Sequence, residues 1–332
     1  MSGTTQILAP SMVRRRLPSV PYQAGVRNTV AVDRDGVLSM VVVRLAFRVA
    51  NGATAPVGPL WQTLARLIRR LEIVVNGQDT VVTISGAHLA SRAQMEFGVR
   101  PFGMDSTIVL TANANTDYEI VLPLPLFLPR AVRPDDCSLD LRRVNQCIAA
   151  ITWGDASDLF GTPGATVAVQ NVTCALEGHY LVNARPDQAF MVRALDMQET
   201  ASPASNSNLT ILQDRGSDLF WRSWHVATTR NNVAVQNIIT GDVRLFAGAF
   251  SYMNRDASAV LAEGAREAAI PWSEYPAADR VYPIRTPYLG QNTTLINAGA
   301  LTGDLYLAAG VTYTSGTEII SISREAMRML RA

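Results

Sequence analysis

The sequence predicts an all-β protein made of two tandem eight-stranded jelly rolls, with short helices in the connections. Segments rich in Val, Ile, Thr and aromatic residues follow one another along the chain, separated by Gly, Asn, Asp or Pro. The chain has 332 residues, of which 48% are hydrophobic, and this is enough for one large core or two medium-sized cores, with two domains favoured. Long excursions between some strands, with helices inside them, favour jelly rolls over a simple meander. Immunoglobulin-type domains are disfavoured, because their Cys, Trp, Cys pattern is missing.

A helix that leads into a hairpin is the clearest local pattern. Residues 59–66 begin with a proline and repeat leucine at helical spacing. From Leu71 the hydrophobic period drops to two, which indicates a strand. Asn76 and Gly77 then supply the positive backbone angles of a tight turn, and Val82 lies on the returning strand.

Two further helices are predicted in the connections between strands. The first covers residues 87–97, with Leu89, Ala93 and Phe97 on one side. The second covers about residues 255–267. Both interrupt segments of strand character, as expected for helices placed in jelly-roll excursions.

The domain organisation follows from a break in the strand pattern near residue 185. "NARPDQ" occurs there, and a Ser- and Asn-rich stretch follows soon after. The predicted parts are an N-terminal arm at residues 1–20, a first jelly roll at 21–185, a second at 186–323, and a C-terminal tail or short helix at 324–332.

Composition excludes several classes of protein. The net charge of +1 does not suggest a broad basic surface that embraces nucleic acid, and no sequence-specific nucleic-acid partner is expected. All 29 basic residues are Arg, which fits a codon-biased genome and also fits guanidinium-rich subunit interfaces. No signal peptide and no apolar run of about 18 to 20 residues is present, so a secreted or membrane-spanning chain is not predicted.

The candidate chemistry is sparse. Cys137, Cys147 and Cys174 lack metal-ligand spacing and are expected to be reduced thiols. The three histidines, His88, His179 and His225, are far apart in sequence and are expected to be structural. No GxSxG elbow nominates a nucleophile. We therefore predict no enzyme activity, no catalytic residues, no cofactor and no metal site.

One acidic pair and one aromatic segment leave alternatives open. Asp135 and Asp136 fit a solvated turn, although paired carboxylates also bind Ca²⁺ or act as acid and base. In "LFWRSWHVATT", strand alternation places Phe220 and Trp224 on one face and Trp221 on the other. Packing in a core or an interface is favoured over a platform for sugars or single-stranded nucleic acid.

The quoted residues carry a family resemblance. "GVLSMVVVRLAFRV", then "GPLWQTLARLIRRLEIVVNG", "VVTISG" and "YEIVLPLPLFLP", resemble segments of the major capsid proteins of double jelly-roll viruses. The resemblance is closest to tailless, lipid-containing bacteriophages, namely corticoviruses, tectiviruses and finnlakeviruses, with adenovirus hexon as a distant relative. It covers most of the first domain, and the second by architecture only.

The resemblance implies a structural protein of the virion, assembled in the host cytoplasm. Its trimers would form pseudo-hexagonal capsomers of an icosahedral shell, with neighbouring capsomers and penton or minor capsid proteins as partners. Such shells often enclose an internal lipid membrane, which would be a further partner. Two other functions stay open. One is a carbohydrate-binding spike or adhesin, and the other is a jelly-roll glycan hydrolase with paired acids.

Arginine clusters at both ends suggest contact with a membrane or with the inner surface of a shell. About 1 kcal/mol per basic residue is gained near an anionic lipid surface, and repetition over a shell multiplies it. A loose tail or an interface clamp is the alternative. The residues are Arg14, Arg15, Arg16, Arg324, Arg328 and Arg331.

Overall fold

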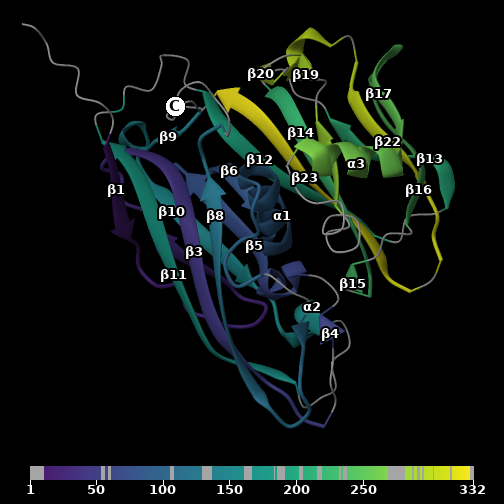
Figure 1. Cartoon of the computed structure of the whole chain (residues 1–332). Coiled ribbons are helices and arrows are strands. Elements are labelled where there is room, and N and C mark those ends of the chain that lie inside the picture. The colour runs from purple at the N-terminus through teal and green to yellow at the C-terminus, as the bar shows by residue number, and fades with distance from the viewer. Residues whose placement is uncertain are drawn as a thin grey trace, which may run out of the picture.

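Two β-sandwiches stand side by side in the chain (Figure 1). The computed structural model describes residues 11–53, 57–58, 61–104, 108–128, 137–160, 167–182, 184, 191–201, 205–214, 219–231, 233–234, 238–267, 281–285, 288–289, 292–293, 295–301, 303–314 and 316–329.

The first sandwich consists of two sheets that face each other, with four main strands in each. One sheet has the order β1 (Ser11–Arg16), β11 (Ala168–Val182), β3 (Val37–Ala50) and β8 (Asn115–Pro125), and β9 (Leu139–Asp140) also pairs with β3. The other has the order β6 (Asp79–Ile84), β5 (Ile68–Val75), β10 (Cys147–Trp153) and β2 (Arg27–Ala31). A short pair, β4 (Val57–Gly58) and β7 (Ile108–Val109), lies outside both sheets.

The second sandwich repeats this plan. One sheet has the order β13 (Asn206–Asp214), β22 (Leu305–Val311), β16 (Ile239–Ala247) and β17 (Phe250–Asp256). The facing sheet contains β12 (Met191–Ala201), β23 (Glu318–Met329), β14 (Leu219–Arg230) and β18 (Val281–Arg285). Minor strands are β15 (Val233–Ala234), β19 (Tyr288–Leu289), β20 (Asn292–Thr293) and β21 (Ile296–Asn297). Among the described residues, the predicted pair of eight-stranded sandwiches is confirmed.

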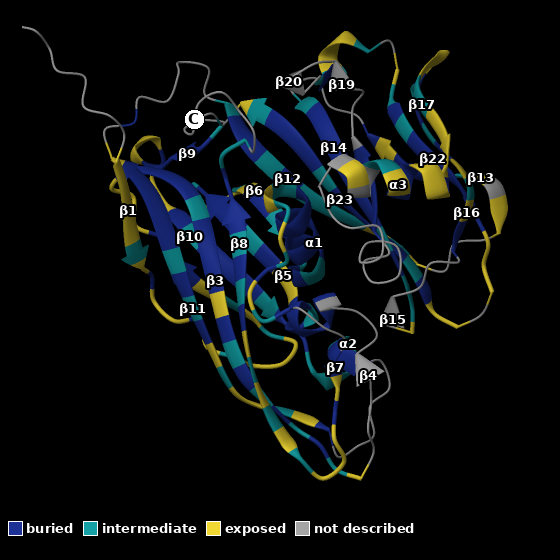
Figure 2. Cartoon of the chain, viewed as in Figure 1, coloured by how far each residue is buried: buried dark blue, intermediate teal, exposed yellow. Residues whose placement is uncertain are grey.

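Each sandwich has its own apolar core, and the two cores exchange residues at the junction. Figure 2 shows buried residues along the inner faces of both sandwiches. Val192 and Leu195 of β12 pack in the first core, whereas Met95, from the helix after β6, packs in the second. We call the sheet that contains β6 and the sheet that contains β12 the inner sheets. A parallel pairing of Leu195 with Val82 joins them. The two sandwiches therefore share one continuous inner sheet layer and are not independently packed domains.

The predicted helix and hairpin are present with one change, except that residues 59 and 60 lie outside the described residues. The helix is a 3₁₀ helix, η1 (Trp61–Leu67), that runs directly into β5. Leu64 and Leu67 are fully buried, and their spacing of three fits the three residues per turn of a 3₁₀ helix. The tight turn is confirmed, since Asn76 and Gly77 have φ angles of 52° and 72°.

The helix α1 (Gly86–Phe97) agrees with the helix predicted at residues 87–97. Ser85 caps it by accepting a hydrogen bond from the His88 backbone N–H, and Gly98 ends it in the left-handed region. Gly86 allows a close approach to η1, because a Cβ there would lie 2.0 Å from the Ala65 carbonyl oxygen.

Two other helices lie in connections. The helix predicted at 255–267 is α3 (Ala257–Glu267), and the short α2 (Ala156–Phe160) was not predicted. Two further 3₁₀ turns are η2 (Leu141–Arg143) and η3 (Ala298–Ala300).

The predicted ends need correction. Residues 11–16 of the predicted N-terminal arm form β1, which pairs with β11. Residues 324–329 continue β23, where a tail or short helix was predicted. The helical reading failed because a spacing of four places Arg324 and Arg328 on one face of a strand as well as of a helix. Residues 185–190 lie outside the described residues, so the boundary at 185 stays a prediction.

The face prediction for the aromatic segment was wrong because β14 contains a bulge between Trp221 and Ser223. The extra residue shifts the alternation, so Trp221 and Trp224 both point into the second core. Their ring centroids lie 6.0 Å apart. The prediction of core packing is confirmed, and these two rings do not form an exposed sugar platform.

Candidate functional site: a polar seam between the jelly rolls

A buried group of charged and polar side chains lies where α1 crosses the inner sheet of the second sandwich. We call it the polar seam. It consists of His88, Arg92 and Glu96 of α1, Arg193 of β12, Arg222 and Ser223 of β14, and Ser321, Ser323 and Glu325 of β23.

Matched periods of helix and strand create the seam. Residues four apart on a helix share a face and are separated by about 6 Å. Alternate residues of a strand share a face and are separated by about 6.6 Å. Consequently His88 meets Ser321, at 2.8 Å between Nε2 and Oγ, and one helical turn later Arg92 meets Ser323.

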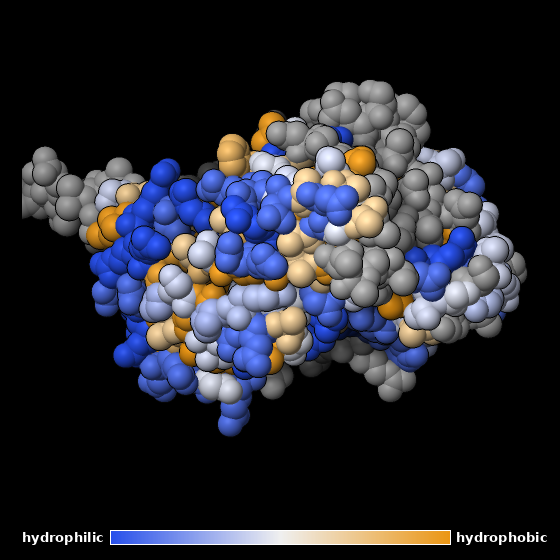
Figure 3. Space-filling model, turned by 90° about the horizontal axis from the view of Figure 1, so that it is seen from below, coloured by the Kyte–Doolittle hydropathy of each residue, from blue (hydrophilic) through white to orange (hydrophobic). Residues whose placement is uncertain are grey.

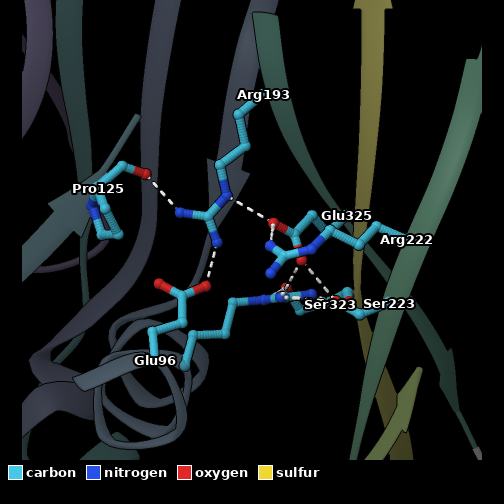
Figure 4. Close-up of polar contacts among 8 residues, drawn as sticks. Glu96, Pro125, Arg193, Arg222, Ser223, Ser323 and Glu325 are labelled. Carbon is cyan, nitrogen blue, oxygen red and sulfur yellow. Dashed lines mark hydrogen bonds and ion pairs between the residues drawn. The ribbon is translucent and has the colours of Figure 1, made fainter. Parts of the chain in front are cut away.

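Glu325 is the centre of the seam (Figure 4). Its Oε1 accepts hydrogen bonds from Arg193 Nε and from Arg222 Nη1, both at 2.6 Å. Its Oε2 accepts one from Ser223 Oγ at 2.6 Å and one from Arg92 Nη1 at 3.3 Å. Burial alone would raise the pKa of Glu325, but Arg193, Arg222 and Arg92 outweigh it and hold the pKa well below its usual range.

Arg193 extends the seam back to the first sandwich. Its Nη1 donates to the Pro125 carbonyl oxygen of β8 at 2.6 Å, and its Nη2 donates to Glu96 of α1. Burial opposes its charge, but Glu325 and Glu96 outweigh burial and raise the pKa of Arg193. One guanidinium therefore connects β8, α1 and β23.

Arg92 and His88 are buried with less charge compensation. Arg92 donates from Nη2 to the Ser323 carbonyl oxygen at 2.8 Å. Burial lowers the pKa of Arg92 to about 10, and Glu325 offsets part of this effect. Burial, together with the positive charges of Arg92 and Arg66, lowers the pKa of His88 to about 3, so its imidazole is neutral near pH 7.

The three central charges of the seam are shielded from solvent. The side chains of Arg92, Arg193 and Glu325 are at most 2% exposed. Losing one member of a buried ionic network leaves its partners unpaired, so such a network disfavours other orientations of the packed elements. Within the described parts of the chain, no three His, Cys, Asp or Glu side chains are grouped as metal ligands.

The N-terminal arginines of the sequence prediction lie on the edge strand β1. Arg14 and Arg16 are exposed. Arg15 pairs with Asp35 at 2.5 Å, and its guanidinium carbon lies 5.6 Å from the centroid of the Tyr180 ring. These three residues therefore form a basic edge on the first sandwich.

The C-terminal arginines are placed differently. Arg324 forms ion pairs with Asp196 and Asp214, and its side chain is 17% exposed. Arg328 donates to Asp79 and to the Thr80 carbonyl oxygen of β6, and its side chain is 15% exposed. Both are occupied inside the chain, with little surface left for an external contact. Arg331 lies outside the described residues.

The remaining sequence candidates have structural settings. Cys147 and Cys174 are buried, and burial raises the pKa of each thiol to about 12. Cys137 is half-buried. His179 is buried beside Glu177, and His225 is buried in β14. Asp135 and Asp136 lie outside the described residues, so their interpretation stays open.

An exposed apolar strip follows the end of α1. Phe97, Val99 and Phe102 are 43%, 67% and 66% exposed. On the face that Figure 3 shows, hydrophobic residues are interspersed among hydrophilic ones. Among the described residues, no helix has the length and apolar character needed to cross a membrane.

No family model matches the sequence, and no curated protein sequence matches it. Solved structures do match. The major capsid protein of Sulfolobus turreted icosahedral virus has a TM-score of 0.72 at 12% identity, over 95% of this chain and 96% of that chain. The major capsid protein P2 of bacteriophage PM2 has a TM-score of 0.59 at 10% identity, over 97% and 98%. A chain of the PBCV-1 virus capsid has a TM-score of 0.65 at 10% identity, over 99% and 97%.

The chain has the double jelly-roll fold. The matches cover both sandwiches, so the likeness extends over the second jelly roll, which the sequence resemblance reached by architecture only. Within this double jelly roll, sequence reasoning missed the polar seam. Two signals were present: a polar residue at every fourth position of α1, and the alternating Ser, Ser and Glu of β23.

Proposed function

We propose that the chain is the major capsid protein of an icosahedral virus and acts by assembling with copies of itself. The observation that carries the proposal is the double jelly-roll fold over nearly the whole chain, shared with structures named as viral capsid proteins. In this function the protein belongs to the virion, and no catalytic step is required.

The polar seam supports a function that depends on fixed shape. A capsomer built from sandwich blocks closes only if the blocks within each chain keep one relative orientation. The seam connects β8 and α1 of the first roll with β12, β14 and β23 of the second. Interlocked cores strengthen the same junction.

The apolar strip is the best candidate surface for contact between copies. Exposed apolar residues that lie close together mark interaction sites on soluble proteins. Phe97, Val99 and Phe102 occur within six residues, and the glycine ends of this loop, Gly98 and Gly103, hold φ angles of 74° and 78°. We assign this strip to the interface of a homotrimer, the pseudo-hexagonal capsomer.

We propose that the basic edge of β1 lies at the inner surface of the shell, where it would face an underlying anionic membrane or other contents of the particle. Arg14 and Arg16 are the residues available for it. Penton and minor capsid proteins would be further partners at the vertices and joints of such a shell.

Native mass spectrometry of the purified chain tests this proposal. One chain has a mass of 36.0 kDa, and we expect a species of three chains. Phe102→Asp should shift the population toward monomers while the circular dichroism spectrum stays unchanged. Phe250→Asp is the matched control, since Phe250 is 63% exposed on β17, a strand of the second roll. A wild-type monomer at all concentrations would contradict the capsid function.

A further inference from the structure

A cavity of about 500 Å³ lies between the two jelly rolls, apart from the strip and the basic edge. Its first-roll wall comes from η1, the start of β5, the N-terminal turn of α1 and α2. Its second-roll wall comes from β12, β14, β18 and β23. In Figure 1 this region lies below α1, between α2 and the lower end of β14. Binding sites for small molecules favour such junctions between domains and have comparable volumes.

Much of the cavity wall is aliphatic. Ile68 and Ala87 contribute from the first roll, and Met197, Ala227 and Ile319 from the second. These side chains offer no hydrogen bonds, so they suit the hydrocarbon part of a ligand.

The charged groups of the wall leave a net positive charge. Arg66, Arg69 and Arg70 face two carboxylates, Asp158 and Glu199. Arg69 and Asp158 form a close pair, with Nη2 and Oδ2 2.8 Å apart. Burial lowers the pKa of Arg66 to about 10, and the charge of Asp158 offsets only part of that. Arg66 is half-buried, and a bound anion would stabilise its cation.

The N-terminal turn of α1 adds to this positive field. Ser85, Ala87 and His88 line the cavity, and the first turn of α1 contains no acidic residue. The partial positive charge of a helix N-terminus favours an anion at this place. His88, 3% exposed, is held by Ser321, and its Nδ1 has no hydrogen-bond partner among the described residues.

We propose that this cavity binds a single-chain anionic amphiphile. The carboxylate or phosphate head lies between Arg66, Arg70 and the N-terminus of α1. The hydrocarbon chain lies along the aliphatic wall formed by Ala87, Met197 and Ile319. Since both rolls contribute to the wall, an occupant would fill the junction on the side away from Glu325 and stabilise the folded pair.

Thermal unfolding and isothermal titration calorimetry of the purified chain test the proposal. The probes are decanoate for a carboxylate head and decyl phosphate for a phosphate head. Decanol supplies the hydrocarbon without the charge, and inorganic phosphate supplies the charge without the hydrocarbon. A ligand that binds only the folded state raises the unfolding temperature in a saturable manner, and we expect this for at least one of the two anionic probes.

Three variants locate the site. Ala227→Trp fills the cavity and should abolish binding. Arg70→Gln removes an exposed rim charge and should weaken binding about tenfold, the loss typical of one charge-assisted hydrogen bond. Arg48→Gln, in an exposed ion pair with Asp117, is the control and should leave binding unchanged. Arg70→Gln keeps the test decisive even if Ala227→Trp fails to fold.

The proposal is overturned by any of three results. The first is that neither anionic probe gives saturable stabilisation. The second is that decanol binds as tightly as decanoate. The third is that Arg70→Gln and Arg48→Gln bind the probe equally. Because the assay uses the free chain, its failure would leave the proposed capsid function in place, and a monomeric chain could still bind the probes.

Discussion

The arginines of β1 and those of β23 both lie near an end of the sequence, but their surroundings in the structure are opposite. Arg14 and Arg16 are exposed on an edge strand that has a single neighbour, β11. Arg324 and Arg328 lie on a strand between β12 and β14, and carboxylates of the same chain hold both.

The difference teaches that position within the sheet, not distance from a terminus, decides what a terminal charge does. An edge strand exposes one side and most of its side chains to water, whereas a central strand in a covered sheet must satisfy each charge internally. Arginine is therefore available for contacts with other molecules on β1, whereas on β23 it pairs with carboxylates of its own chain. Substitutions should separate these two roles.

The largest effect is expected at the centre of the seam. Glu325→Gln removes the negative charge that Arg92, Arg193 and Arg222 share at the centre of the seam. Breaking a buried ionic network in this way costs about 3–5 kcal/mol. Urea unfolding followed by circular dichroism measures the loss.

Glu119→Gln is the matched control for this substitution. Glu119 is an exposed carboxylate on β8, and its replacement should change the free energy of unfolding by less than about 0.5 kcal/mol. Equal effects of the two substitutions would show that the seam does not hold the rolls together.

The next effect is a pH dependence that originates at His88. The folded protein keeps this imidazole neutral because its pKa is lowered to about 3, whereas an unfolded chain protonates it below its ordinary pKa of 6.5. Stability is therefore fully present above pH 6.5 and is lost as the pH falls toward 3. The slope from this one group approaches about 1.4 kcal/mol per pH unit.

His88→Gln isolates that contribution, since Gln keeps a polar group for Ser321 without titrating. Urea midpoints between pH 4.5 and 7.5, converted to free energies, should depend less on pH in the variant than in the wild type. Parallel pH profiles of the two proteins would contradict the neutral, buried assignment.

The smallest effect on stability is expected on β1. The double substitution Arg14→Gln and Arg16→Gln should leave the urea midpoint unchanged, because both side chains are exposed. Binding of the unassembled chain to vesicles of phosphatidylglycerol and phosphatidylcholine should weaken, by about 1 kcal/mol per arginine in contact with the vesicle. Co-sedimentation measures it, and unchanged binding would remove β1 from the proposed inner surface.

Local patterns in the sequence were sufficient for the architecture. Alternating apolar residues, the turn at Asn76 and Gly77, and the helical spacing of residues 87–97 each reflect short-range geometry, and each is confirmed. The helix at 59–66 came out as a 3₁₀ helix because a short apolar repeat does not distinguish three from 3.6 residues per turn.

Features that depend on pairing between distant segments could not be predicted in the same way. The bulge that turns Trp221 into the core arises where β14 pairs with β23, about 100 residues later. The spacing of Arg324 and Arg328 is compatible with a helix and with a strand, and only the pairing of β23 with β12 and β14 decides between them.

The seam shows this limit most clearly. Its helix residues are more than 200 positions from their partners on β23, so neither half reveals its partner. Read alone, Arg92 and Glu325 look like ordinary surface charges. Their burial follows from the packing of α1 on the second roll, which is a property of the whole fold.

A cryo-electron microscopy reconstruction of the assemblies formed by the purified chain tests the central claim most directly. The account predicts a trimer whose six sandwiches stand upright in one ring, with α1 and β23 joined through Glu325 in every copy. Free monomers, or trimers in which the two rolls of a chain adopt different relative orientations, would contradict it.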